Sequence, residues 1–235
     1  MTAIPVPRLA VLSSWTHGLL RGRLCADGLL DQLDGPEFFF APPFDPAAWL
    51  LDLQLMHRPI VNLVLPQPGR IAGLIGPPPA IAAALDAGQA LVVADGPLAH
   101  HTLTVHRQDP HHRTLVVDRH NAPPNRPVTP QRTDGAREHL FRCLQDAADR
   151  AQRLDIVLEE PVGPAELPDD WFLMEPHPGI DAGHVETARI AGRAAVQCER
   201  LLEDPDLDTA RRELVRDLHD AARSALSAVL SSSPV

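Results

Sequence analysis

The spacing of apolar residues divides the first part of the chain into short segments of regular structure. Leucines at helical spacing over residues 15–33, interrupted by three glycines, predict one helix or two short ones. Asp45 and Pro46 form a start signal for the next helix, which we expect to end before residue 58. The apolar positions over 49–55 also alternate, so a strand is the alternative for this segment.

The middle of the chain changes from strand signals to a helix signal and back. An apolar run at 60–65 predicts a strand, followed by a Pro-Gly turn and a short extended run to Ile75. An alanine-rich helix is expected over 78–87, because Gly88 stands where a helix commonly ends. A buried strand is expected to follow at 89–94.

Six of the twelve histidines lie close together after this strand and raise the question of a functional site. Two antiparallel strands are expected at 99–107 and 113–120, joined by the sequence QDPH, which has proline where a type I turn prefers it. Side chains of a strand alternate between its two faces. The core face then contains His101, Leu103 and Val105, and the opposite face His100, Thr102, Thr104 and His106.

The polar face of this hairpin yields the one candidate metal site. If His106 pairs with Thr114, His100 falls opposite His120, and Asp118 stands beside them. Opposed Cβ atoms lie about 4.5–5.5 Å apart, and two imidazoles with one carboxylate at that separation suit Zn²⁺ or Fe²⁺. The predicted ligands are therefore His100, Asp118 and His120. The alternative, which the pattern favours, is a hairpin without a metal site, with one face exposed to solvent and histidine as a polar residue on that face.

The second half of the chain is dominated by helix signals. Residues 121–132 contain four prolines and no hydrophobic period, so they predict a linker. The proline-rich acidic stretch 155–181 is expected to be an ordered loop pinned by Trp171 and Phe172. The last helix carries an apolar stripe ending at Val229, for which intrachain packing is expected and a homodimer seam is the alternative. Three helices are expected, over about 134–154, 182–203 and 206–230, with Asp204-Pro205 capping the third.

These elements predict an α+β protein with a mixed, mainly antiparallel sheet, a helical layer and a C-terminal helical hairpin. We expect a mixed α/β body over 1–120, a proline-rich linker over 121–132, and a helical layer over 133–235 that packs on the body as one unit. No internal repeat is visible in the sequence.

Three features together resemble a known group of proteins. They are WTHGLLRGRL near the start, VLPQPGRIAGLIGPPPAIAAALDAGQALV in the middle, and the terminal helical hairpin. The combination resembles an uncharacterised conserved-protein family of GC-rich bacteria and covers about half of the chain. The resemblance implies no activity, because none is attached to that family.

Charge limits the classes of partner. The chain has 31 acidic and 21 basic side chains, a formal net charge of −10, and no basic run longer than Arg211-Arg212. Because phosphate neutralisation requires clustered positive charge, we expect neither a nucleic-acid partner nor an anionic membrane surface. The start lacks a secretory signal and no apolar run approaches the ~20 residues of a bilayer span, so a cytoplasmic location is expected.

Missing residue types limit the chemistry further. All basic residues are arginine, and the chain has neither lysine nor tyrosine, which excludes Schiff-base chemistry and a phosphate-loop lysine. Cys25, Cys143 and Cys198 are expected to be buried free thiols. The glycines of GRIAGLIGPPP fit turns and no phosphate-binding fingerprint. Ser13 or Ser14 is expected to be an N-cap.

Two hypotheses of different class remain for the function. The first is a cytosolic, non-catalytic interaction or regulatory protein with no cofactor, whose helical layer or phenylalanine run (Phe38, Phe39, Phe40 and Phe44) contacts another protein. A core plug is the favoured interpretation of that run. The second is a metal-dependent hydrolase that holds Zn or Fe at the hairpin and uses Glu159 or Glu160 as a base. The sequence leaves open whether the protein is an enzyme.

Overall fold

The computed structural model describes most of the chain as two compact units. It describes residues 3–33, 40, 43–107, 115–123, 125–128, 133, 135–153, 167–168 and 170–231. One unit is built from residues 1–7, 132–176 and 181–229, and the other from 8–131, 177–180 and 230–235. The two units therefore take up alternating stretches of the sequence. The sequence-based division at 121–132 remains a prediction.

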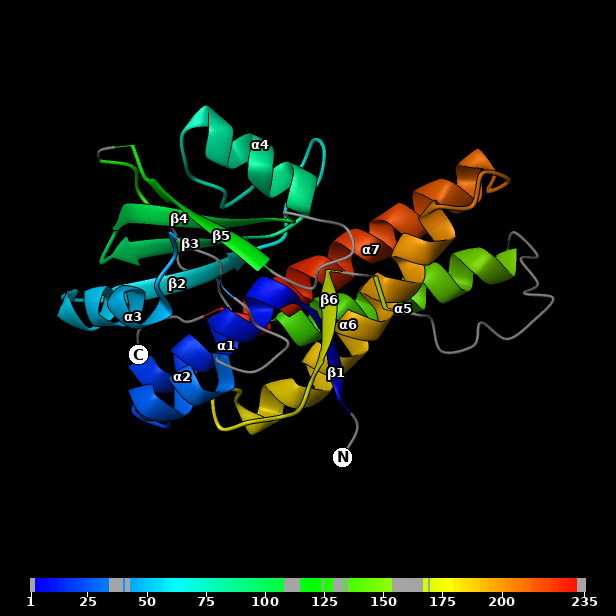
Figure 1. The fold of residues 1–235 in the computed structure, drawn as a ribbon. Coiled ribbons are helices and arrows are strands. Elements are labelled where there is room, and N and C mark those ends of the chain that lie inside the picture. The colour runs from blue at the N-terminus through cyan, green and yellow to red at the C-terminus, as the bar shows by residue number, and fades with distance from the viewer. Residues whose placement is uncertain are drawn as a thin grey trace. The chain divides into compact units, whose positions relative to one another are not determined.

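The centre of the 8–131 unit is a sheet of four strands in the order β2-β3-β4-β5, with every neighbouring pair antiparallel. Nearly every residue of the first two strands is buried, because helices cover both faces of the sheet (Figure 1). The strands are β2 (Pro59–Val64), β3 (Ala90–Asp95), β4 (Leu98–Arg107) and β5 (Leu115–Asn121).

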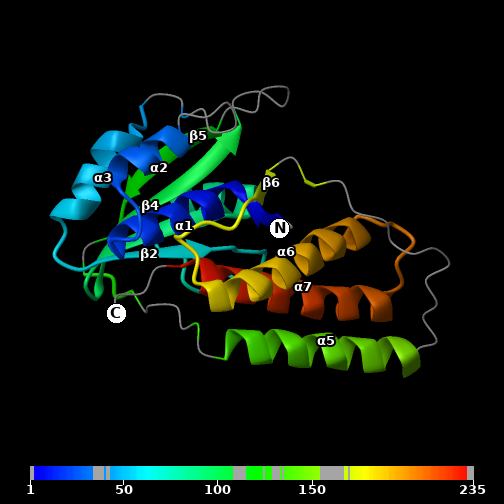
Figure 2. The same cartoon turned by 90° about the horizontal axis from the view of Figure 1, so that it is seen from below.

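Four helices accompany this sheet. Helix α4 (Pro78–Ala87) packs against β4 on one face, and α1 (Arg8–Leu20) packs against β2 and β3 on the other. Helices α2 (Ala26–Leu33) and α3 (Pro46–Leu55) lie on the same side as α1, as Figures 1 and 2 both show. The core of this unit includes an apolar cluster of Ile60, Val64, Val92, Ala94 and Val128.

The other unit combines a small sheet with three helices. Strand β1 (Ile4–Pro7) pairs antiparallel with β6 (Trp171–Met174). Helix α6 (Ala182–Leu202) packs on β1 so closely that a Cβ at Gly192 would overlap the carbonyl oxygen of Pro5. Helices α5 (Ala136–Arg153), α6 and α7 (Thr209–Leu230) lie side by side (Figure 2).

An ion pair joins the two C-terminal helices. The Glu199 carboxylate of α6 accepts hydrogen bonds from Arg223 (2.6 Å) and His219 (3.2 Å) of α7. Burial lowers the pKa of Arg223, and the Glu199 carboxylate opposes this effect.

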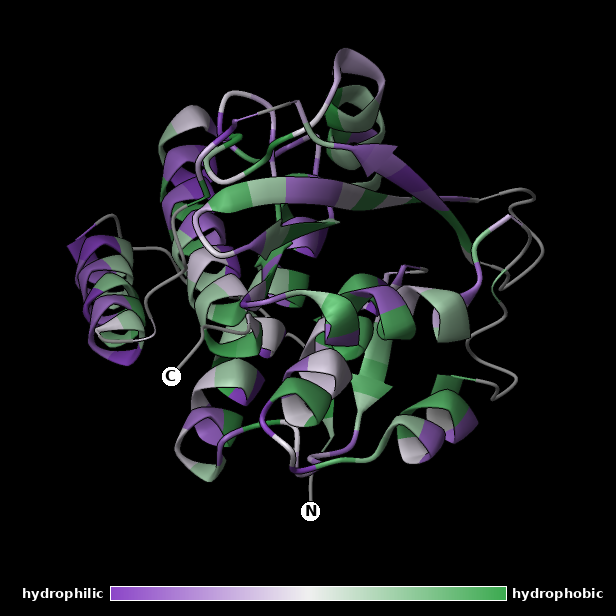
Figure 3. Ribbon diagram, turned by 90° about the vertical axis from the view of Figure 1, so that its left-hand side faces the viewer, coloured by the Kyte–Doolittle hydropathy of each residue, from purple (hydrophilic) through white to green (hydrophobic). Residues whose placement is uncertain are grey.

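The helices carry hydrophilic and hydrophobic residues on different faces, as the changing ribbon colours in Figure 3 show. This pattern places the apolar stripe of α7, including Leu214, Ala221 and Val229, in the protein interior.

The predicted fold class, α+β with a mainly antiparallel sheet and a C-terminal helical pair, is confirmed. Two local predictions are confirmed as well. Asp45 caps α3, since its Oδ1 accepts from the N–H groups of Ala47 (2.9 Å) and Ala48 (3.3 Å). Gly88 ends α4 in the left-handed conformation, with φ of 64°.

Other local predictions are wrong. Ser13 and Ser14 do not cap a helix, because α1 begins at Arg8 and both serines are buried inside it. Trp171 and Phe172 belong to strand β6 instead of a loop. Helix α7 begins after Asp208, whose Oδ1 accepts from the N–H of Arg211, so the start predicted at 206 is too early. Several predictions fall outside the described residues: those for the QDPH turn, Glu159, Glu160, Phe38 and Phe39.

Candidate functional site

The two histidine-bearing strands form as predicted, but their pairing differs from the expected one. Thr102 pairs with His120 and Thr104 with Asp118, while His106 pairs with Val116. The predicted register, with His100 opposite His120, is therefore wrong by two residues. A shift of two keeps every side chain of β5 on its expected face, because the side-chain period of a strand is two.

A β-bulge at His100 also breaks the expected alternation of side chains. The pairing of β3 with β4 shifts between Val93 and Ala94, so that Val93 pairs with His101 and Ala94 with Ala99. A bulge inserts one extra residue into a strand and redirects its side chain. As a result the rings of His100 and His101 contact each other, with centroids 5.1 Å apart.

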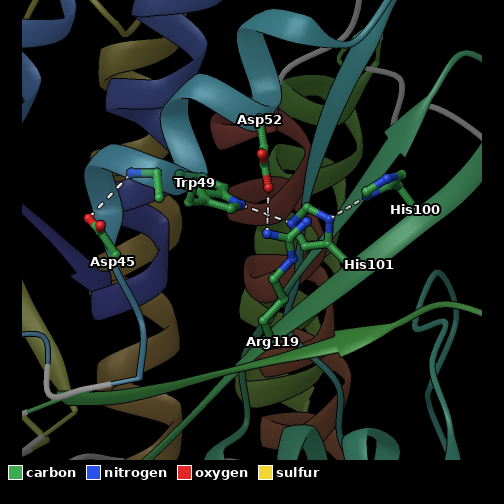
Figure 4. A network of polar contacts seen from close by, with 7 residues as sticks. Asp45, Trp49, Asp52, His100, His101 and Arg119 are labelled. Carbon is green, nitrogen blue, oxygen red and sulfur yellow. Dashed lines mark hydrogen bonds and ion pairs between the residues drawn. The ribbon is translucent and has the colours of Figure 1, made fainter.

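His101 is the buried centre of a hydrogen-bonded row of three side chains (Figure 4). Nε1 of Trp49, on α3, donates to Nε2 of His101 at 2.9 Å. Because an indole N–H is only a donor, Nε2 of His101 holds a lone pair and the ring proton is on Nδ1. This Nδ1–H donates to Nδ1 of the exposed His100 at 2.8 Å. The proton of neutral His100 is therefore on Nε2.

An ion pair stands beside this row. Arg119 of β5 binds the carboxylate of Asp52 of α3 at 2.6 Å (Figure 4). Burial lowers the pKa of His101 to about 3, and the positive charge of Arg119 acts in the same direction, while Asp52 opposes it. His101 therefore stays neutral and accepts the Trp49 hydrogen bond throughout the physiological pH range.

The residues predicted as metal ligands occupy three different environments. His100 contacts His101, Asp118 pairs with His106 at 2.9 Å, and Nε2 of His120 lies 3.0 Å from the hydroxyl of Thr104. Within the described part of the chain, no three His, Cys, Asp or Glu residues are grouped as metal ligands. For His100 to bind a metal, it must first change tautomer or leave His101, so the site remains a prediction.

A second polar pair, Ser14 and His177, was not predicted as a site from the sequence. The hydroxyl of Ser14 lies 3.1 Å from Nε2 of His177, whose ring stacks on Trp15 at 4.1 Å. Burial lowers the pKa of His177 to about 4. No local signal could have revealed the pair, because 163 positions separate its members.

The direction of the hydrogen bonds in this pair is opposite to that of a serine hydrolase. The N–H of Gly179 donates to Nδ1 of His177 at 3.0 Å, so Nε2 carries the proton and donates to Ser14. The Ser14 hydroxyl in turn donates to the carbonyl of Val11 at 2.9 Å. A nucleophilic serine needs a histidine nitrogen that accepts its proton, so this pair is arranged for structure.

The outer face of α3 differs from the rest of the helix in its exposure. Trp49, Leu50 and Leu53 are buried, whereas Leu51 and Leu55, one turn apart, are 60% and 85% exposed. Ala47, Ala48 and Gln54 are exposed as well. We call Ala47, Ala48, Leu51, Gln54 and Leu55 the outer face of α3. It carries no charged side chain.

Several contacts hold α3 in place behind this face. Asp45 caps its first turn, while Trp49 and Asp52 bind His101 and Arg119 of the sheet. After its last turn, Asp95 of β3 accepts from the N–H groups of Arg58 (2.7 Å) and His57 (3.3 Å). The bond from Arg58 is the main cause of the lowered pKa of Asp95.

The remaining candidates in the described part of the chain are two phenylalanines of the predicted plug and the cysteines. Phe40 and Phe44 contact each other, and Phe44 contacts Trp49 at 6.0 Å between ring centroids, as expected for a plug against the core. The prediction of three buried thiols holds only for Cys198, since Cys143 is half-buried and Cys25 is exposed. The Cys25 sulfur accepts a hydrogen bond from the N–H of Gly28 at the start of α2. Burial raises the pKa of Cys198 to about 12, which makes it unreactive.

Comparison with known proteins identifies the family. Residues 9–130 match the family described as Rv1486c-like protein, N-terminal domain. The chain belongs to this family. The match covers α1 to β5 and so contains α3, its outer face and the histidine row. No match was found among curated proteins or among solved structures. Among the described helices, none has both the length and the apolar character needed to cross a membrane.

Proposed function

We propose that this Rv1486c-like chain is a cytoplasmic, non-catalytic interaction or regulatory protein that binds another protein through the outer face of α3. The exposure of Leu51 and Leu55 on a firmly anchored helix is the observation that carries this proposal. Single exposed leucines are common on protein surfaces, but two on adjacent turns beside two exposed alanines form a continuous apolar stripe.

The anchoring of α3 supports a binding role. The hydrogen bond from Trp49 to His101 and the ion pair of Asp52 with Arg119 fix the helix on the sheet. A surface that is already ordered loses little conformational entropy when a partner binds. The tautomers of His101 and His177 leave neither ring with a free nitrogen that could take a proton from a nucleophile, which supports a role without catalysis.

The partner that fits this surface is a protein with an apolar centre and a basic border. Asp45 is exposed at one end of the outer face and Asp52 borders it, and the whole chain has a net charge of −10. Complementary charges around an apolar centre accelerate association and select the partner. The acidic border opposes pairing of this face with the same face of a second copy of the chain.

Site-specific photo-crosslinking in cells tests the proposal. A photo-reactive amino acid replaces Leu55, and in a control it replaces Ala82, an exposed residue of α4. We expect one crosslinked partner protein from position 55 and none from position 82. No crosslink at position 55, or equal products at both positions, would contradict the proposal. A product of two copies of the chain would replace the proposed partner with a homodimer.

The affinity of the chain for the crosslinked partner can then be measured with both proteins purified. Complete burial of a leucine contributes about 1.5–3 kcal/mol, and 1.4 kcal/mol is tenfold in affinity. Leu51→Gln and Leu55→Gln are therefore each expected to weaken binding by roughly tenfold or more. Ile71→Gln, at an exposed apolar position outside the outer face of α3, is the control and should bind nearly as the unchanged chain does.

A further inference from the structure

The two edge strands of the four-stranded sheet differ in their chemical character. The order β2-β3-β4-β5 leaves β2 and β5 at the edges. Strand β5 carries Asp118, Arg119 and His120, and charged residues of this kind discourage another strand from pairing with an edge. Strand β2 has the sequence PIVNLV, without a charged residue, and so lacks this protection.

Ser231, the residue that follows α7, lies at the edge of β2. The backbone N–H of Leu63 in β2 donates to the hydroxyl of Ser231 at 2.9 Å, across 168 positions of sequence. Leu63 and Ser231 are both buried, with 0% and 2% of their surface exposed. Ser231 thus occupies a hydrogen-bonding position that an added strand would use.

Two side chains of α1 hold this C-terminal end in place. The hydroxyl of Ser13 donates to the carbonyl of Leu230 at 2.6 Å, and Nδ1 of His17 donates to the carbonyl of Ser231 at 3.1 Å. The last carbonyl groups of a helix have no donor within the helix. Ser13 and His17 supply these donors, which explains two buried polar residues inside α1.

We propose that Leu230 and Ser231 form a latch that closes the β2 edge against strand addition by a second copy of the chain. Released from the latch, β2 pairs antiparallel with β2 of another copy, because its short, uncharged and β-branched sequence is suited to pair with itself. This latch is separate from the outer face of α3 and does not depend on the proposed function.

Removal of the latch is the direct experiment. A chain that ends at Val229 is compared with the full chain by sedimentation velocity over a range of concentrations. We expect the shortened chain to associate to a species of about twice the mass of the full chain's own species, as pairing of two edges requires. A folded shortened chain that sediments like the full chain at every concentration would overturn the proposal.

A point variant keeps the test decisive if the shortened chain does not fold. Ser231→Ala removes only the hydroxyl that accepts from Leu63, and hydrogen exchange then reports on the Leu63 amide. We expect exchange at Leu63 to be roughly fivefold faster or more, the factor that corresponds to one hydrogen bond. Ser224→Ala, at an exposed position of α7, is the matched control. Unchanged exchange at Leu63 in Ser231→Ala would refute the latch.

Discussion

Nε1 of Trp49 lies 2.9 Å from Nε2 of His101, and the hydrogen bond between them ties helix α3 to strand β4 in the protein interior. Both residues are almost fully buried, with 1% and 0% of their surface exposed. The bond also decides which nitrogen of His101 carries the proton, and through His101 it decides the tautomer of His100. One of the six histidines clustered at 97–120 is thus an anchor for α3.

A double-mutant cycle measures the strength of this anchor. Trp49→Phe removes the donor and leaves a buried acceptor on His101, and His101→Phe leaves the indole N–H of Trp49 unsatisfied. We expect each change to lower the free energy of unfolding by about 1–3 kcal/mol or more, with a clear coupling between the two. Urea denaturation gives the four values, and His57→Phe, at an exposed position, is the control. Strictly additive effects would show that the bond contributes nothing.

Stability should fall as the solution becomes acidic. Burial lowers the pKa of His101 to about 3 and that of His177 to about 4, whereas an unfolded histidine titrates near 6.5. At a pH between the folded and the unfolded pKa, only the unfolded chain binds the proton. The free energy of unfolding is therefore highest above about pH 6.5 and decreases as the pH falls below that value. His101 accounts for about 1.4 kcal/mol per pH unit in this window.

Urea denaturation at several pH values checks this expectation. The slope of stability against pH below about 6 should be smaller in His101→Phe than in the unchanged chain. His57→Phe again serves as the control, because it removes an exposed histidine and should keep the original slope. An unchanged slope in His101→Phe would mean that His101 does not stay neutral in the folded protein.

The close contact of α6 with β1 predicts opposite effects at two glycines of one helix. Gly192→Ala places a Cβ against the carbonyl oxygen of Pro5, so we expect a loss of about 1–3 kcal/mol in the free energy of unfolding. Gly183→Ala has open space around its Cβ and should stabilise α6 by about 0.5–1 kcal/mol. Thermal unfolding of both variants gives the comparison. A Gly192→Ala chain as stable as Gly183→Ala would contradict the close packing of α6 on β1.

Zinc titration tests the metal site predicted from His100, Asp118 and His120. Nδ1 of His100 already accepts a hydrogen bond and its Nε2 carries the proton, so we expect His100→Ala to leave zinc affinity unchanged. Calorimetry of the unchanged chain, His100→Ala and His120→Ala, with His57→Ala as control, makes the comparison. Binding of one zinc per chain that both His100→Ala and His120→Ala abolish would support the metal-dependent alternative.

Local sequence signals predicted much of the secondary structure. The Asp45-Pro46 start signal gave the beginning of α3, Gly88 marked the end of α4, and alternation correctly placed Leu103 and Val105 in the core. These features depend on neighbours within a few positions, since capping, turn chemistry and side-chain periodicity act over that distance.

The tertiary structure alone decided the features that join distant parts of the chain. Pairing of β3 with β4 creates the bulge at His100, which the local alternation of residues does not reveal, and pairing of β1 with β6 spans most of the sequence. The proton on His101 is placed by Trp49, 52 positions away, and Ser13 bonds Leu230, 217 positions away. Periodicity shows which face a residue occupies, but which partner meets it there is decided only when the whole chain is packed.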